Sequence, residues 1–158
     1  MRFVWAGAIL LTAGCWTALA EQVGIKPETC LSVKTAALRL GELAETIRSC
    51  TGVINDKSLT EAIRLEATAQ RGILYARRWR LTDVLQDARE AIADFSEGLR
   101  SNAIAQEKRH QLLTWRGELY EATGQARRAR DDFTAVLRIS PSDEIARAAL
   151  RRLDAPTN

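Results

Sequence analysis

Histidine is nearly absent from this chain of 158 residues, which contains only His110. A nucleophile triad needs a histidine to activate its serine or cysteine, and His110 stands between Arg109 and Gln111 with no acid beside it. The chain has no glycine-rich phosphate loop, no His-Glu-x-x-His motif and no Cys-x-x-Cys motif. Acidic pairs such as Asp131-Asp132 are typical of a solvated helix face. We therefore expect a protein that is not an enzyme and that holds no cofactor and no metal.

Proline and glycine are scarce as well, with three and nine residues. Asn-Gly and Asp-Gly pairs, which mark tight β-hairpins, do not occur, and β-branched residues form no runs. A hydrophobic content of 46% is enough for one modest core. These features predict a single folded unit of the all-α class.

A large excess of one charge is also missing, because the formal net charge is only +3. Chains that bind nucleic acid gather positive charge to neutralise phosphates, so we expect no nucleic-acid partner. One cluster, Arg77-Arg78-Trp79-Arg80, allows another interpretation, in which three cations and an indole dock on lipid headgroups or a nucleic-acid backbone. The favoured interpretation is that these arginines solvate the end of a long helix while Trp79 closes a turn.

The start of the chain has the organisation of a secretory signal peptide. Residues 1–20 contain one charge, Arg2, then an apolar run, and end in Ala18-Leu19-Ala20, a small-x-small cleavage pattern. We expect cleavage after Ala20, a short leader over residues 21–26 and a periplasmic or secreted location. Two alternatives stay open. Thr12-Ala13-Gly14-Cys15 resembles a bacterial lipoprotein signal that would lipidate Cys15, and an uncleaved signal segment would anchor the chain in the membrane.

Two cysteines, Cys30 and Cys50, lie beyond this segment. An even number of cysteines in an exported chain predicts a disulfide. In a cytosolic protein, which the signal segment argues against, both would be buried free thiols. Two thiols without histidines cannot complete a tetrahedral zinc site.

Two stretches of the chain repeat one another. Gln70-Arg71-Gly72-Ile73-Leu74-Tyr75 is followed by Ala91 and Phe95, and Trp115-Arg116-Gly117-Glu118-Leu119-Tyr120 is followed by Ala129 and Phe133. A glycine on one helix lets a second helix approach closely, and an alanine and an aromatic residue four positions later interlock on that second helix. The pattern resembles the tetratricopeptide repeat (TPR), and the whole chain is similar to small exported TPR proteins of Gram-negative bacteria.

The resemblance implies an α-solenoid of about three TPR-like helical hairpins and a C-terminal capping helix. In the best match, Gly124 suits the left-handed residue that ends a first helix, and Pro141 ends the second helix. The residues expected to pack the repeats are Gly72, Tyr75, Ala91, Phe95, Gly117, Tyr120, Ala129, Phe133 and Pro141. The expected divisions are the signal peptide (1–20), the leader (21–26), a degenerate disulfide-linked hairpin (27–60), a repeat with an insertion (61–105), a repeat (106–142), the capping helix (143–153) and a tail (154–158).

The middle repeat is longer than the last one. Gly72 and Phe95 are 23 residues apart, whereas Gly117 and Phe133 are 16 apart. The seven extra residues are expected between the two helices. Arg77 to Leu81 would form a protruding turn, and Thr82-Asp83 would cap the second helix. The first helix of this repeat is expected to begin at a capping box, Ser58-Leu59-Thr60-Glu61.

The first repeat is visible only by counting along the family pattern. If Gly41 corresponds to Gly124, then Thr46 and Cys50 take the places of the alanine and the aromatic residue. Cys30 then takes the place of the family's tryptophan. The resemblance thus implies that the two cysteines face each other and that their disulfide replaces an aromatic interlock.

The last helix is expected to cover the apolar flank of the final hairpin, with Ser142 as its N-cap. The expected inward residues are Ile145, Ala148, Ala149 and Leu150, and the outward ones are Arg147, Arg151 and Arg152.

The resemblance also implies where a protein partner binds. In TPR proteins the first helices of successive hairpins line a groove that takes an extended peptide or a partner helix. In this sequence the corresponding residues are Glu66, Ala69, Ile73, Ala76, Gln111, Thr114, Glu118 and Glu121. This slightly acidic face favours a partner segment with Lys or Arg and an apolar anchor against Ile73.

We therefore expect a non-catalytic scaffold or adaptor of the periplasm or envelope that binds another protein. The alternative is a structural or assembly protein held at the membrane through lipidated Cys15 or by the Arg77 to Arg80 turn, whose repeats mainly space or stack subunits. An uncleaved leader would also attach the chain to the membrane. An enzyme is the third and least favoured interpretation.

Overall fold

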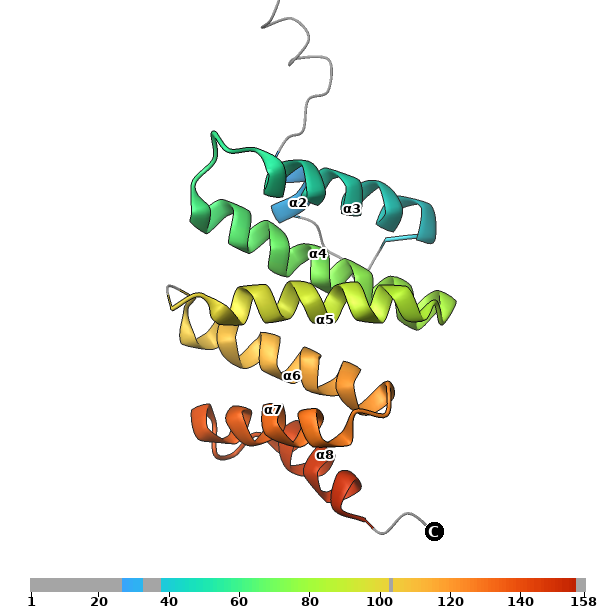
Figure 1. Ribbon diagram of the computed structural model, residues 1–158, viewed down its shortest axis with the longest axis vertical. Helices are drawn as coiled ribbons and strands as arrows, with labels where there is room; N and C mark the ends of the chain where they lie inside the picture. Colours follow the sequence, from blue (N-terminus) through green and yellow to red (C-terminus); the bar gives the residue numbers. More distant parts are fainter. Residues whose placement is uncertain (1–26, 33–37, 103, 156–158) are drawn as a thin grey trace, which may run out of the picture.

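The computed structural model describes residues 27–32, 38–102 and 104–155. These residues form seven helices and no strand (Figure 1), so the predicted all-α class is confirmed. The predicted signal peptide, the leader and Cys15 lie outside the described residues.

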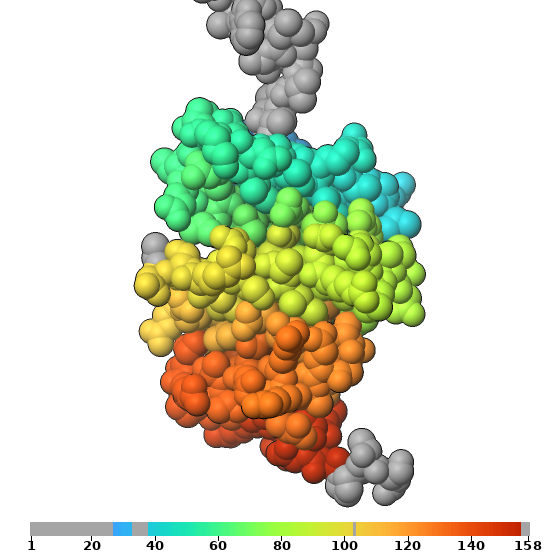
Figure 2. Space-filling view, in the orientation of Figure 1, coloured from blue at the N-terminus to red at the C-terminus, as the bar shows by residue number. Residues whose placement is uncertain are grey.

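The helices pack in chain order. They are α2 (Pro27–Leu31), α3 (Leu40–Asn55), α4 (Glu61–Thr82), α5 (Leu85–Arg100), α6 (Gln106–Ala122), α7 (Ala126–Ile139) and α8 (Glu144–Asp154). Each contacts the next along the chain, and α2 also contacts α4. The result is a stack along the long axis of the molecule, from α2 and α3 at one end to α7 and α8 at the other (Figures 1 and 2).

Three apolar clusters hold successive groups of helices together. Leu43, Val53 and Leu74 belong to the cluster of α2, α3 and α4. Phe95 is at the centre of the cluster of α4, α5 and α6, and Phe133 is at the centre of that of α6, α7 and α8. All five side chains are fully buried. The core is continuous along the stack, because Tyr75 packs against the first two clusters and Ile92 and Leu99 pack against the last two.

Gly72 and Gly117 lie at close helix contacts. A Cβ on Gly72 would lie 2.7 Å from Cε1 of Phe95, and a Cβ on Gly117 would lie 3.1 Å from Cε1 of Phe133. Each repeated stretch therefore uses its glycine to admit the phenylalanine ring of the following helix. Gly124, with φ of +75°, is in the left-handed region just after α6, where a side chain would be strained.

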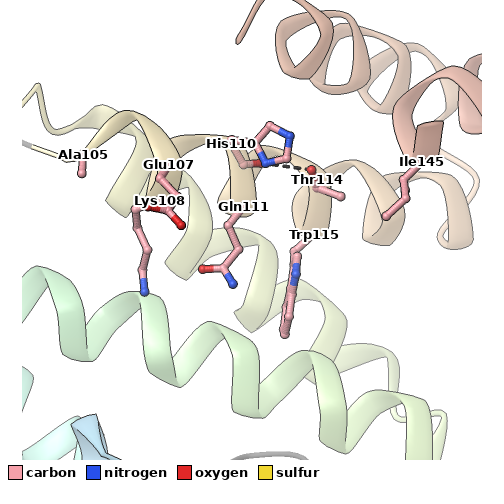
Figure 3. Close-up of a pocket in the computed structure, with 8 residues that line it drawn as sticks. All are labelled: Ala105, Glu107, Lys108, His110, Gln111, Thr114, Trp115 and Ile145. Atoms are coloured by element: carbon pink, nitrogen blue, oxygen red, sulfur yellow. Dashed lines mark hydrogen bonds between the residues drawn. The ribbon is translucent and has the colours of Figure 1, made fainter. Parts of the chain in front are cut away.

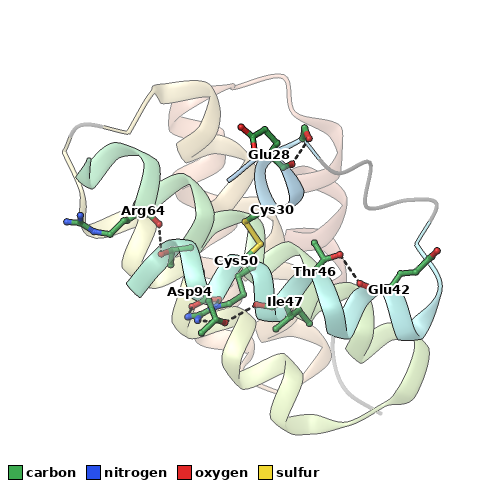
Figure 4. The surroundings of a disulfide bond; sticks show 12 residues. Glu28, Cys30, Glu42, Thr46, Ile47, Cys50, Arg64 and Asp94 are labelled. Atoms are coloured by element: carbon green, nitrogen blue, oxygen red, sulfur yellow. Dashed lines mark hydrogen bonds and ion pairs between the residues drawn. A yellow bond between two sulfur atoms is a disulfide. The ribbon is translucent and has the colours of Figure 1, made fainter. Parts of the chain in front are cut away.

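The disulfide between Cys30 and Cys50 is present, which confirms the predicted pair (Figure 4). The two Cα atoms are 4.9 Å apart, and both residues are fully buried. Because α2 has only 5 residues, it has little apolar surface of its own with which to hold its position. The disulfide fixes α2 on α3.

The insertion in the middle repeat lengthens α4 instead of forming a loop. Arg77 to Leu81 were expected as a protruding turn, but α4 continues to Thr82, so this prediction is wrong. Asp83, at φ of 56°, ends α4 by donating its N–H to the carbonyl of Trp79, and α5 begins at Leu85. Thr82-Asp83 is therefore not the N-cap of α5. No glycine or proline interrupts this stretch, so the helix continues through it.

Two other residues predicted at helix ends do not have the predicted role. The N-cap of α4 is Thr60, whose hydroxyl accepts from the N–H of Ile63, and Ser58 instead hydrogen-bonds to Asp56 before the helix. Gly41 lies in the first turn of α3, without a left-handed φ, so it does not play the part of Gly124.

The capping helix α8 also differs in detail from the prediction. Its N-cap is Asp143, not Ser142, because the Asp143 carboxylate accepts from the N–H of Ala146 at 2.8 Å. Ile145 was expected to face inward but is 57% exposed, while Ala146 is fully buried in its place. Ala146 and Ala149, three positions apart, share the buried side of α8, and Ile145 lies outside it.

Candidate functional site

Helices α4 and α6 lie side by side, joined by ion pairs that skip over α5. The ammonium Nζ of Lys108 on α6 is 2.7 Å from Oε1 of Glu66 on α4. In the opposite direction, Nη2 of Arg80 on α4 is 2.7 Å from Oε2 of Glu118 on α6. We call the surface formed by α4, α6 and α8 the even face.

Helix α8 continues this face. Arg152 donates two hydrogen bonds of 2.9 Å to the carboxylate of Glu121 on α6. The three acids expected to attract a basic partner, Glu66, Glu118 and Glu121, thus each already face a cation of a neighbouring helix. These three carboxylates therefore offer little uncompensated negative charge to a partner's lysine or arginine.

Most of the small and apolar residues expected in the groove are buried. Ala69, Ile73, Ala76 and Thr114 have exposed fractions of 1%, 7%, 2% and 7%. The first three belong to the core cluster around Phe95, so Ile73 is not available as a surface anchor. Gln111, in contrast, is exposed.

Two cavities open on the even face. The first, of about 570 Å³, lies between α6 and the start of α8 (Figure 3) and is lined by Ala105, Glu107, Lys108, His110, Gln111, Thr114, Trp115 and Ile145. The second, of about 240 Å³, lies between α4, the end of α5 and the start of α6, and is lined by Ala62, Leu65, Glu66, Ala69, Gly98, Ser101, Ile104, Ala105 and Lys108. Ala105 and Lys108 line both cavities, so the two are adjacent.

The first cavity combines apolar walls with an amide. The Trp115 ring is fixed by an edge contact with Phe95, with ring centroids 6.1 Å apart. Ile145 comes from α8 on the other side, and Gln111 offers both a donor and an acceptor. This arrangement can bury an apolar side chain and hydrogen-bond to a peptide main chain.

His110 does have an acidic partner, but from a distant part of the chain. Its Nε2 is 3.0 Å from Oδ2 of Asp143, 33 residues later in the sequence. The nearby hydroxyl of Thr114 donates to the main-chain carbonyl of His110, at 3.0 Å, and not to the ring. Because Asp143 also caps α8, the contact ties α6 to the start of α8.

Sequence reasoning missed the buried arginine–aspartate pairs behind the even face. Arg71 on α4 donates to both carboxylate oxygens of Asp94 on α5, at 2.9 and 2.8 Å, and also to the hydroxyl of Thr51 on α3, at 3.1 Å. The hydrogen bond to Asp94 raises the pKa of Arg71, and burial raises the pKa of Asp94. This contact joins three consecutive helices.

The same contact recurs one repeat later. Arg116 on α6 donates to both carboxylate oxygens of Asp132 on α7, at 2.8 and 2.7 Å, and to the hydroxyl of Ser96 on α5, at 2.9 Å. A sequence signal for it exists, because both repeated stretches contain arginine directly before the glycine and aspartate directly before the phenylalanine.

The Arg77-Arg78-Trp79-Arg80 cluster does not form one cationic surface. Arg78 donates two hydrogen bonds, of 2.7 and 2.6 Å, to the buried carboxylate of Asp87, and these bonds raise the pKa of Arg78. Arg80 pairs with α6 as described above, and Trp79 packs against the core cluster around Phe95. Trp79 therefore does not close a turn, and two of the three arginines are paired.

Comparison with known proteins does not assign the chain to a family. The sequence matches no protein-family model and no curated protein. Function is therefore inferred from the residues of the even face. Within the residues described by the structure, none of the helices has the length and apolar character needed to cross a membrane. In the same part of the chain, His, Cys, Asp and Glu side chains form no group of three that could hold a metal ion.

Proposed function

We propose that this protein is a non-catalytic interaction module that binds a peptide or a helix of a partner protein on the even face. The observation that carries this proposal is the pair of adjacent cavities that meet at Ala105 and Lys108. Their walls offer apolar contacts from Leu65, Trp115 and Ile145. Surfaces of this kind recognise a few anchoring side chains of a bound segment.

The finer architecture that we propose is a TPR-like solenoid. The contacts of Gly72 with Phe95 and of Gly117 with Phe133 support it, since they are the glycine–aromatic contacts that the repeat pattern implies. The left-handed Gly124 after α6 supports it as well.

The proposed partner segment differs from the one expected from sequence. Because Glu66, Glu118 and Glu121 are paired, the segment does not need a basic residue opposite them. It would place an apolar side chain between Trp115 and Ile145 and its main chain against Gln111. The proposed location is the periplasm or envelope, and the buried disulfide supports an oxidising compartment.

Co-purification from the native envelope fraction tests the proposal, with retained proteins identified by mass spectrometry. Ile145→Asp places a charge in the first cavity, and an acid is tolerated in the first turn of α8. Leu40→Asp is the matched control, because Leu40 is 49% exposed, lies in the first turn of a helix as Ile145 does, and lines neither cavity. We expect a partner that wild type and Leu40→Asp retain and Ile145→Asp loses. Equal retention by all three proteins would contradict binding on the even face.

A further inference from the structure

The turn between α4 and α5 carries exposed apolar side chains. Leu81, Val84 and Leu85 have exposed fractions of 58%, 49% and 48%. Only two other large hydrophobic residues are comparably exposed in the described part of the chain, Leu40 and Ile145. We call residues 81–85 the α4–α5 tip. Clustered apolar side chains at the surface often mark a site of interaction with a protein or a membrane.

The tip projects from the stack. Helix α4 has 22 residues and α6 has 17, and in Figures 1 and 2 the α4–α5 pair ends beyond the α6–α7 pair. The Arg78–Asp87 hydrogen bonds join α4 to α5 next to the tip, and Trp79 packs into the core one turn away. The apolar residues are therefore held outward on a rigid support, so the stack itself does not cover them.

The base of the tip carries positive charge. One turn before Leu81, Arg77 hydrogen-bonds to the carbonyl of Leu38 at 3.3 Å, and its Nε is buried without a partner. Arg77 has no carboxylate partner among the residues that the structure describes. The Arg80 side chain is paired but still 56% exposed, and the exposed acid of the tip is Asp83. Arginines thus stand four residues and one residue before Leu81, and of the two the Arg80 side chain is the more exposed.

We propose that the α4–α5 tip docks on an anionic membrane surface. Its apolar side chains would enter the interface of the bilayer, and Arg77 and Arg80 would lie at the level of the phosphates. The size of the tip favours a bilayer over a second copy of the chain, because a stable protein interface uses about 20–30 residues a side. This docking is independent of protein binding on the even face and of lipidation at Cys15.

Co-sedimentation with vesicles of phosphatidylethanolamine and phosphatidylglycerol tests the proposal, using the full protein as isolated from cells. We expect wild type to bind, and the double variant Leu81→Ser/Leu85→Ser to bind at least ten-fold more weakly. Ile145→Ser is the matched control and should bind like wild type, since Ile145 is equally exposed but lies on the even face. Arg77→Gln should weaken binding to these vesicles and have little effect on vesicles of phosphatidylcholine alone.

The outcomes separate the tip from other sources of binding. Equal binding of wild type and the double variant would overturn the proposal, because the contact would then lie elsewhere in the chain. A wild-type protein that does not sediment would overturn it as well. Light scattering without lipid is the second measurement. If wild type is an oligomer and the double variant is a monomer, the tip binds a second copy of the chain instead of a membrane. Matching far-UV circular dichroism of the variants would show that none of these results comes from unfolding.

Discussion

At the scale of single residues, Gly72 sets the distance between α4 and α5. An alanine there would place its Cβ 2.7 Å from Cε1 of Phe95 and 3.1 Å from Cβ of Asp94. The ring is fully buried and cannot move aside freely, so Gly72→Ala should destabilise the protein by about 1–3 kcal/mol. The free energy of unfolding in urea measures this effect.

Gly41→Ala is the matched control for that prediction. Gly41 is also helical, but no atom would lie within 4 Å of its added Cβ. Alanine should therefore be neutral or stabilising there by up to about 1 kcal/mol, since it loses less backbone entropy on folding. A similar loss of stability in both variants would mean that the Gly72 contact is not what limits the approach of α4 and α5.

Single residues also show what the sequence could and could not predict. The disulfide was predictable because only Cys30 and Cys50 lie beyond the predicted signal segment. The Arg71–Asp94 pair was missed because a charged residue on a helix is usually solvated, and only the packing of α4 on α5 brings these two together. The repeated Arg-Gly and Asp-Phe pairs of residues are the one sequence signal for this contact, and only the helix packing shows that the arginine and the aspartate meet.

At the scale of the element, the start of α8 depends on Asp143. Its carboxylate accepts from the N–H of Ala146 and also lies 3.0 Å from Nε2 of His110. Asp143→Ala should therefore cost about 1–2 kcal/mol, the usual range for the loss of an N-cap. Ser142→Ala should have no measurable effect, because Asp143, not Ser142, caps the helix. Equal losses of stability in the two variants, measured by thermal unfolding, would contradict the assignment of Asp143 as the residue that caps α8.

The elements themselves were easier to predict than their ends. The glycine-to-phenylalanine spacing revealed seven extra residues, but a loop and two additional helical turns fit that number equally well. The residues from Arg77 to Thr82 contain no helix breaker, and Arg78 finds a buried partner in Asp87 only if the helix continues. The Arg78–Asp87 ion pair joins two helices across the turn between them, so the helix propensities of the residues in that stretch do not predict it.

At the scale of the whole molecule, the main contacts of each helix are with helices one or two positions away along the chain, so a loss of stability should stay local. Replacing both Cys30 and Cys50 by serine opens a disulfide that spans 20 residues, which should cost about 3 kcal/mol. Hydrogen exchange should show loss of protection in α2 and α3 and little change in α7 and α8. Uniform loss along the chain would show instead that the stack unfolds as one unit.

The even face was predicted only in outline. Helical periodicity and the resemblance to the TPR pattern predicted that Gln111 lies in a groove, and Gln111 lines a cavity of the even face. The burial of Ile73 and the pairing of Glu118 with Arg80 were not predictable, because both depend on how closely α4 approaches α6. The contribution of Ile145 depends on the start of α8, which the sequence misplaced by one residue.

The contact made by Arg71 and Arg116 has a consequence for how such a chain can grow. Arg71 reaches back to a hydroxyl on the preceding helix, Thr51, and Ser96 receives the corresponding arginine of the following helix. The unit made of α4 and α5 therefore begins with an arginine, Arg71, that donates to a hydroxyl of the preceding helix, and ends with a hydroxyl, Ser96, that accepts from the arginine of the following helix. A tandem duplication of the gene segment that encodes α4 and α5 would place Ser96 of the first copy next to Arg71 of the second. The junction would then reuse the hydrogen bond that Ser96 already makes with Arg116, so the stack could lengthen with the same helix–helix contacts.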